Sequence, residues 1–222
     1  MAETAPPSAS APAAPSLRER KKQRTRQALI DAALDLFTER GFGAVTLDEL
    51  CDSVEVSKRT FFRTFSSKED VAMAPTQDLW AAFLDELDHA AAGPARPLVQ
   101  VLHDALLRAI RRMPDDGWAD RALASRRLAA RTPSMDAHGL QFCDRTSRAA
   151  VEIARRRFDL ADPADDLRPR LAVDLLVAAF HRALERWTES GSHPTAAGLA
   201  ATVEVAFAAV PESLALTATP HA

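Results

Sequence analysis

Residues 46–68, TLDELCDSVEVSKRTFFRTFSSK, constrain the fold most, because they specify two short helices separated by a tight turn. Thr46 and Glu49 have the spacing of a capping box, which predicts that a helix begins directly after Thr46. The apolar residues of this helix recur at helical spacing and leave the acidic ones on the other face. Ser57 suits the N-cap of a second helix over residues 58–64, which carries three bases and no acid. The segment therefore predicts a helix-turn-helix whose second helix suits a phosphate-lined groove.

A long helix is expected ahead of this pair, over residues 17–39, and it should end at Gly41, a favourable residue just past a helix. Its first ten residues carry six bases and one acid, although the formal net charge of the whole chain is −3. Residues 1–16 are rich in Ala, Pro and Ser and are predicted to form a disordered arm. The three helices together predict a DNA-binding domain over residues 17–66.

Every periodic segment after this domain also predicts a helix, and the breaks between segments contain Gly or Pro. The expected helices cover about residues 67–91, 97–113, 118–131, 134–159, 167–189 and 195–210. No alternating run of strand length appears. The predicted fold class is all-α, with a small N-terminal domain, a larger helical domain over residues 67–211 and a flexible tail over residues 212–222.

Several function classes are disfavoured by what the sequence lacks. Cys51, Cys143 and the six histidines show no metal-ligand spacing, and there is no Gly-rich phosphate loop or nucleophile motif. We therefore expect no metal, no cofactor and no catalytic activity. No run approaches the roughly 20 apolar residues of a membrane span, and the N-terminus has no apolar signal core. A cytoplasmic protein without a membrane segment is expected.

The pattern G-F-x-x-x-T-x-x-x-L, followed by V-S-x-x-T-F-F-x-x-F-x-S-K-E, resembles the signature of the TetR family of bacterial transcriptional regulators. It is carried by Gly41, Phe42, Thr46, Leu50, Val56, Ser57, Thr60, Phe61, Phe62, Phe65, Ser67, Lys68 and Glu69. The resemblance covers about residues 24–70, and the remainder matches only in being helical and of suitable length. It implies a homodimer, most often a repressor, that reads a palindromic DNA operator. It also implies a C-terminal domain that dimerises through its last two long helices and binds a small ligand, whose binding releases the DNA.

We expect the second short helix to read base edges in a major groove. Its candidates, next to the cap Ser57, are Lys58, Arg59, Thr60 and Arg63. Arginine suits this role because it can bridge guanine O6 and N7 in one bidentate contact. The alternative is a solvated charged face, which the same residues would also form.

Phosphate contacts are expected around that helix. The resemblance implies that Thr46 and Lys68 contact phosphates, and a helix N-terminus independently favours an anion. Phe62 and Thr64 stand where the family often has phosphate-bonding tyrosines, although this sequence contains no tyrosine. The basic first helix should add nonspecific affinity through counterion release, with the candidates Lys22 and Arg26.

Two residues depart from what such a chain usually has. Glu55 stands in the turn where the family commonly has glycine, so that a strained backbone or a different turn is expected. Pro75 lies inside the helix expected over residues 67–91 and should interrupt or kink it, because proline cannot donate the helical hydrogen bond.

The sequence is less specific about a ligand pocket and a dimer interface. Pocket candidates on the middle helices, which an ordinary core would also use, are His103, Leu106, Ile110, Trp118, Phe142, Val177 and His181. Interface candidates, which a monomeric bundle would also bury, are Leu171, Leu175, Leu184, Trp187, Leu199, Val203 and Phe207. A ligand is expected to be small and apolar or amphipathic. Control of a DNA-binding regulator or adaptor by a protein partner is the alternative.

Overall fold

The computed structural model describes residues 16–91, 93–160, 166–189 and 193–218, and these residues contain helices and no strand. The helices are α1 (Leu17–Arg40), α2 (Leu47–Ser53), α3 (Lys58–Phe62), α4 (Lys68–Asp88), α5 (Leu98–Arg111), α6 (Trp118–Ala129), α7 (Pro133–Arg157), α8 (Arg168–Glu189) and α9 (Ala196–Leu214). The predicted all-α class is confirmed. Residues 1–15, most of the predicted arm, lie outside the described residues, as do residues 219–222 of the predicted tail.

The N-terminal helices begin at side-chain caps, as the sequence predicts. Thr46 accepts from the N–H of Glu49, whose carboxylate accepts from the N–H of Thr46, and this closes the predicted capping box. Ser57 caps α3, which ends at Phe62 and is shorter than the expected helix over residues 58–64. Ser16 forms a second capping box at the start of α1, and the helix begins at Leu17 as predicted.

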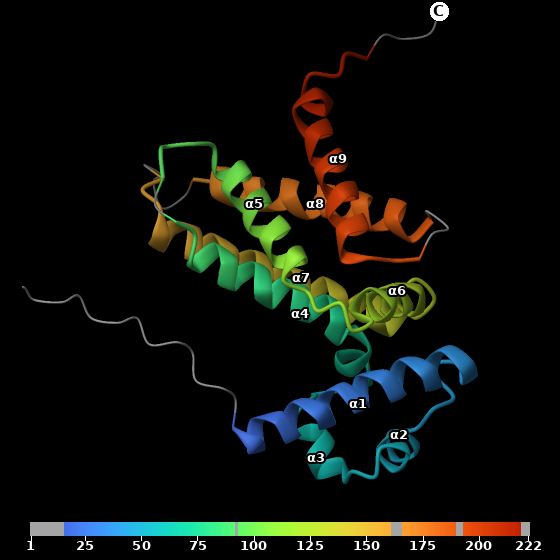
Figure 1. The fold of residues 1–222 in the computed structure, drawn as a ribbon. Coiled ribbons are helices and arrows are strands. Elements are labelled where there is room, and N and C mark those ends of the chain that lie inside the picture. Colours follow the sequence, from blue (N-terminus) through green and yellow to red (C-terminus); the bar gives the residue numbers. More distant parts are fainter. Residues whose placement is uncertain (1–15, 92, 161–165, 190–192, 219–222) are drawn as a thin grey trace, which may run out of the picture.

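Helix α4 lies at the centre of the chain and contacts α1, α5, α6 and α7 (Figure 1). It is one helix from Lys68 to Asp88 with Pro75 inside it, so the predicted interruption is wrong. Proline removes one helical hydrogen bond, but Pro75 is buried. Its carbonyl accepts a hydrogen bond from the indole Nε1 of Trp118 at 3.0 Å. Packing along both sides of α4 thus outweighs the lost backbone bond.

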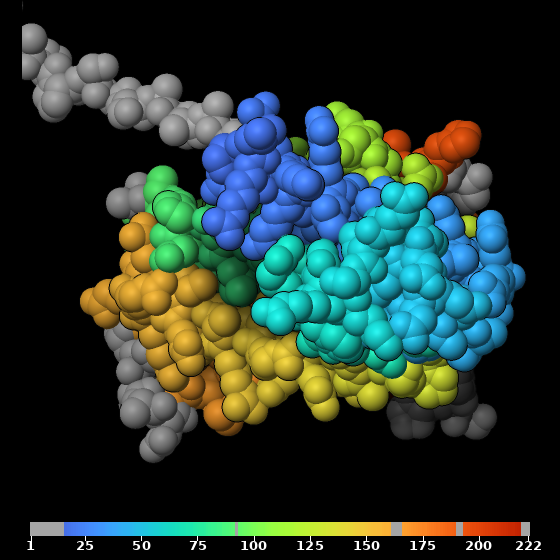
Figure 2. Space-filling view, turned by 90° about the horizontal axis from the view of Figure 1, so that it is seen from below, coloured from blue at the N-terminus to red at the C-terminus, as the bar shows by residue number. Residues whose placement is uncertain are grey.

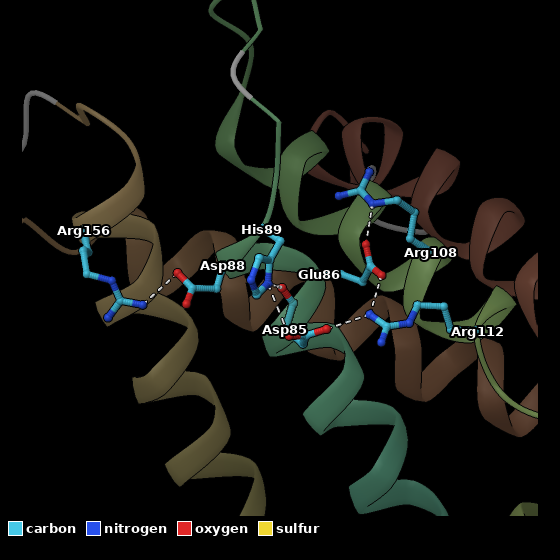
Figure 3. Close-up of polar contacts among 7 residues, drawn as sticks. All are labelled: Asp85, Glu86, Asp88, His89, Arg108, Arg112 and Arg156. Carbon is cyan, nitrogen blue, oxygen red and sulfur yellow. Dashed lines mark hydrogen bonds and ion pairs between the residues drawn. The ribbon is translucent and has the colours of Figure 1, made fainter. Parts of the chain in front are cut away.

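The far end of α4 is held by ion pairs to two neighbouring helices (Figure 3). Just beyond α5, Arg112 donates to Asp85 and Glu86, both at 2.7 Å. Arg156 of α7 donates to Asp88 at 2.8 Å. Hydrogen bonds from Arg112 lower the pKa values of both Asp85 and Glu86. These contacts fix the end of α4 that is remote from α1–α3.

The described residues contain two apolar cores. The smaller is formed by α1, α2, α3 and the first turns of α4, together with Leu128 of α6 and Met135 of α7. The larger core joins α4 to α5–α9. In Figure 1, α1–α3 lie at one end of the molecule, below the layer that contains α4 and α7. The N-terminal helices therefore rest on the ends of α6 and α7 as well as on α4.

Helix α9 is mostly exposed. It buries Leu199, Ala200 and Val203, and its C-terminal half projects away from the other helices (Figure 1). Ala196–Leu214 has a mean hydropathy of 1.3 and is long and apolar enough to cross a bilayer by length and composition. The expectation that no segment approaches a membrane span was therefore wrong for this helix. Because α9 extends to Leu214, the start of the predicted flexible tail is also helical.

Candidate nucleic-acid interface and ligand cavity

The side chains of α3 divide into a buried face and an exposed face. Phe61 and Phe65 are buried at 0% and 4% exposure, whereas Phe62 is 56% exposed and meets the ring of Phe61 edge to face. The side chains of Arg59 and Arg63 are exposed and have no hydrogen-bond or ion-pair partner among the described residues. Figure 2 views the molecule from the α1–α3 end, where the cyan surface of α3 and its flanking turns lies open. Two arginines are therefore free to contact a ligand on this face.

The other predicted residues of α3 already have partners within the helix-turn-helix. Lys58 forms an ion pair with Asp48 of α2 at 2.9 Å, and both side chains are more than half exposed. The hydroxyl groups of Ser57 and Thr60 are 3.1 Å apart. The hydroxyl of Thr64 donates to the carbonyl of Thr60 at 3.4 Å. Lys58 can exchange its exposed carboxylate partner for a phosphate, because such surface pairs contribute little stability.

The turn between α2 and α3 contains the expected backbone strain. Glu55 has φ 54°, the left-handed region that favours glycine, and it is the only non-glycine residue with positive φ in the described chain. The N–H groups of Glu55 and Val56 donate to Asp52 and Cys51, at 3.1 and 3.0 Å. These two bonds close the turn and set the angle at which α3 leaves α2.

Thr46 is exposed, and its polar groups are engaged with Glu49. Its N–H and hydroxyl both donate to one carboxylate oxygen, at 2.8 and 2.9 Å. These bonds, with that from the Arg40 guanidinium, lower the pKa of Glu49 to about 2. The capping role of Thr46 is thus present in the structure, and its phosphate contact stays a prediction.

Two basic residues predicted to contact DNA are bound within the protein. Arg26 makes a bidentate contact to Asp78 of α4, at 2.9 and 2.7 Å, and lies over the ring of Phe65. Lys68 donates to the carbonyls of Phe42 and Val45, at 2.8 and 2.6 Å. These partners engage two donors of each side chain. The predicted DNA contacts of Arg26 and Lys68 stay predictions, and Lys22 of α1 is exposed.

A cavity of about 340 Å³ lies between α4, α6, α7 and α8. Of the predicted pocket residues, Phe142, Val177 and His181 line it. The other four lie elsewhere. Leu106 and Ile110 are fully buried in the larger core, Trp118 is bonded to Pro75, and His103 stacks on Phe207 at 3.9 Å between ring centroids. Sequence reasoning missed several lining residues, among them Trp80, Phe83, Ser125, Ser147 and Phe180.

The cavity and the core of the N-terminal domain share side chains. Met73 of α4, Ala129 at the end of α6 and Met135 of α7 line the cavity. The same three residues belong to the smaller core or pack directly against it. A molecule that fills the cavity would therefore press on residues that support α1–α3.

Most predicted interface residues have a different role. Leu184, Trp187, Leu199 and Val203 are between 1% and 8% exposed, because α8 and α9 pack against each other within one chain. These four are corrected to intrachain core residues. Leu171 is 54% exposed, and Leu175 and Phe207 are half-buried, so that these three retain surface for a partner.

The exposed α3 on an all-helical scaffold defines a class, the helix-turn-helix DNA-binding proteins. Residues 29–74 match the family described as bacterial regulatory proteins, tetR family. The chain is 38% identical over 191 residues to the HTH-type transcriptional regulator TcmR of Streptomyces glaucescens, and the match covers 84% of this chain and 83% of TcmR. The chain therefore belongs to the TetR family of DNA-binding transcriptional regulators. Its relatives are regulators rather than enzymes.

Solved structures share the fold at low sequence identity. A TetR-family regulator from Syntrophomonas wolfei superposes with a TM-score of 0.58 at 16% identity, covering 89% of this chain and 97% of that one. The complex of SmeT with triclosan superposes with a TM-score of 0.50 at 19% identity, covering 84% of this chain and 91% of that one. These similarities support the fold alone.

Proposed function

We propose that this protein is a homodimeric repressor that a small molecule releases from a palindromic operator. The observation that carries the proposal is the shared wall of the cavity, since Met73 and Met135 contact both the cavity and the core beneath the DNA-reading helix. Ligand binding and operator binding can then each require a different arrangement of these side chains.

DNA recognition is assigned to the exposed face of α3. Arg59 and Arg63 read bases, because both are exposed and unpaired within the described chain. Lys58, Thr60 and Phe62 add contacts in the same groove, and Ser57, Thr64, Thr46 and Lys22 meet the phosphate backbone. A twofold dimer would present its two α3 helices about 34 Å apart, or a multiple of it, to palindromic half-sites.

Dimerisation is assigned to the exposed faces of α8 and α9. Val205 on α9 and Leu171 on α8 are 56% and 54% exposed, although both are large apolar residues. An apolar helix that is largely unburied in one chain is expected to be covered in the working molecule, and a second copy is the partner that the family implies. The dimer is assigned to the cytoplasm, where it can meet DNA.

Ligand response is assigned to the cavity between α4, α6, α7 and α8. At about 340 Å³ it falls within the range of small-molecule sites. The ligand is small and apolar or amphipathic. In the same fold, SmeT has been solved with triclosan bound, which supports a small-molecule response without identifying the ligand of this chain.

Selection of genomic DNA fragments by the purified protein, scored for a palindrome, tests the proposal. Recovery of a palindrome that one dimer binds, as measured by light scattering of the complex, is the expected result. Enrichment of a non-palindromic site, or binding as a monomer, would contradict the dimeric part. Binding that no cavity-filling compound weakens, but a protein in cell extract does, would favour control by a protein partner.

A further inference from the structure

The cavity has an aromatic and rigid inner wall. Trp80, Phe83 and Phe180 are at most 6% exposed. The ring of Trp80 meets Phe83 edge to face at 5.3 Å between centroids and Phe180 at 5.0 Å. Phe142 lines the cavity from α7. Because the rings hold one another in place, the wall is preformed and favours a ligand with flat faces over a flexible chain.

Neutral polar groups are set into this wall. Ser125 and Ser147 are 2% and 3% exposed and are the buried polar residues of the described chain. Both line the cavity, and so do Thr76 and Thr146. The hydroxyl of Ser125 has no hydrogen-bond partner in the part of the chain that the structure describes. This oxygen is open to the cavity, so a ligand oxygen can bond to it there in place of water.

Charged groups lie at the mouth of the cavity and neutralise one another. Arg182 and Glu185 form an ion pair at 2.8 Å, and Arg126 lies 3.9 Å from the same carboxylate. Asp136, the other acidic lining residue, is exposed. The inner part of the cavity therefore offers no free charge to pair with an ionised ligand. Burying such an unpaired charge is strongly unfavourable.

Two titratable groups also line the cavity, Cys143, which is half-buried, and His181, which is exposed. Burial raises the pKa of the Cys143 thiol, and the nearby hydroxyl of Ser147 only partly opposes this effect. Desolvation lowers the pKa of the His181 imidazole, and the guanidinium groups of Arg126 and Arg182 add to that effect. Both shifts favour the uncharged form of the group.

We propose that this cavity binds a neutral, rigid aromatic molecule of about three fused rings that carries hydroxyl or carbonyl oxygens on its edge. This inference rests on the proposed function, which makes the cavity the ligand site, and it adds the chemical class. The aromatic face of the ligand packs against the wall formed by Trp80, Phe83 and Phe180, and its edge oxygens bond to the hydroxyl of Ser125. Carboxylates, sulfonates, organic cations and alkyl chains are disfavoured.

Four probes test the class on the full-length protein without DNA. They are 1,8-dihydroxyanthraquinone, which is neutral, anthraquinone-2-sulfonate, 9-aminoacridine, which is a cation, and dodecanoate. The first three have similar size and differ in charge. Calorimetric titration should show that the neutral probe binds at least about tenfold more tightly than each of the others. It should also quench tryptophan fluorescence, and Trp80→Phe should remove most of that quenching, because Trp118 and Trp187 do not line the cavity.

Two serine variants test the position of the oxygen contact. Ser125→Ala should weaken binding of the neutral probe about fivefold. Ser213→Ala is the matched control, because its hydroxyl bonds to the carbonyl of Val210 on α9, outside the cavity. Circular dichroism should show the same helical content in both variants.

Tighter or equal binding of the anion, the cation or dodecanoate would overturn the proposed class, and so would the failure of all four probes to bind. The operator complex separates this proposal from the proposed function. A neutral probe that binds but leaves the operator complex intact would keep the ligand class and contradict only the release step. Failure to select any operator, with the neutral probe still bound, would contradict only the DNA-binding proposal.

Discussion

The two free arginines of α3 make the sharpest prediction at the level of single residues. Arg59→Ala or Arg63→Ala should weaken specific binding by about 1–3 kcal/mol if that arginine bridges a guanine, and should relax sequence preference at one position. Lys22→Ala should weaken binding equally on all sequences and reduce the salt dependence instead. Fluorescence anisotropy on the selected operator and on scrambled DNA separates these effects. An arginine whose removal leaves the operator affinity unchanged does not read a base.

Glu55 makes a prediction about stability. Its φ of 54° is unfavourable for any residue with a Cβ atom, so Glu55→Gly should raise the free energy of unfolding by about 1 kcal/mol. Glu55→Ala keeps the Cβ atom and is the matched control, with an expected change near zero. Urea unfolding followed by circular dichroism measures both. A gain in the alanine variant as large as in the glycine variant would mean that the side-chain charge, not the backbone, causes the strain.

Sequence reasoning at the residue scale succeeded where the interaction is local. The caps at Thr46 and Ser57 join residues three apart, and the spacing of two side chains specifies them fully. It did not find the internal partners of Arg26 and Lys68, which lie 52 and at least 23 positions away. A basic residue near a DNA-binding motif has the same sequence signature whether its partner is a phosphate or a carboxylate of the next helix.

Helix α7 is the element that joins the cavity to the N-terminal domain. Near its start, Met135 is fully buried in the smaller core. One turn further, a Cβ atom on Gly139 would lie 3.1 Å from the terminal methyl of Met73. A side chain at this position would require the flexible end of Met73 to shift by a few tenths of an ångström.

Gly139→Ala should therefore act as a partial mimic of a bound ligand. The added methyl group displaces Met73, and operator affinity should fall several-fold without any ligand. Gly93→Ala is the control, because a Cβ atom there meets nothing within 4 Å. Electrophoretic mobility shift with the purified variants measures the change. Full operator affinity in a folded Gly139→Ala protein would contradict the coupling through Met73.

At the scale of elements, the helices were predictable and their partners were not. Periodicity located α5–α9 within a few residues, since each helix must bury one stripe. Yet the apolar stripes of α8 and α9 are buried inside one chain at Leu184 and Leu199, where the sequence also allowed a dimer interface. At Pro75 the sequence predicted an interruption that the structure does not show, because a rule for an isolated helix omits the packing on both sides of α4.

For the whole molecule, the exposed apolar surface of α9 predicts obligate association. Val205→Glu should convert the dimer to a monomer at micromolar concentration and reduce operator affinity by at least about tenfold, because two half-sites are no longer bound together. Ala81→Glu introduces the same charge on an exposed position of α4 and should leave the dimer intact. Sedimentation velocity measures the association state. A Val205→Glu protein that still sediments as a dimer would place the interface elsewhere.

The methionine wall between the cavity and α1–α3 also has a thermodynamic consequence. Coupling between two binding sites is reciprocal, so an operator must weaken a cavity ligand by the same factor by which that ligand weakens the operator. Under the proposed release mechanism, molecules already on DNA are therefore the last to accept ligand, and the ligand first fills the pool that is free in solution. The ligand concentration at which a gene responds then depends on how far the number of protein copies exceeds the number of operators. A larger pool of free protein shifts the response to higher ligand concentration.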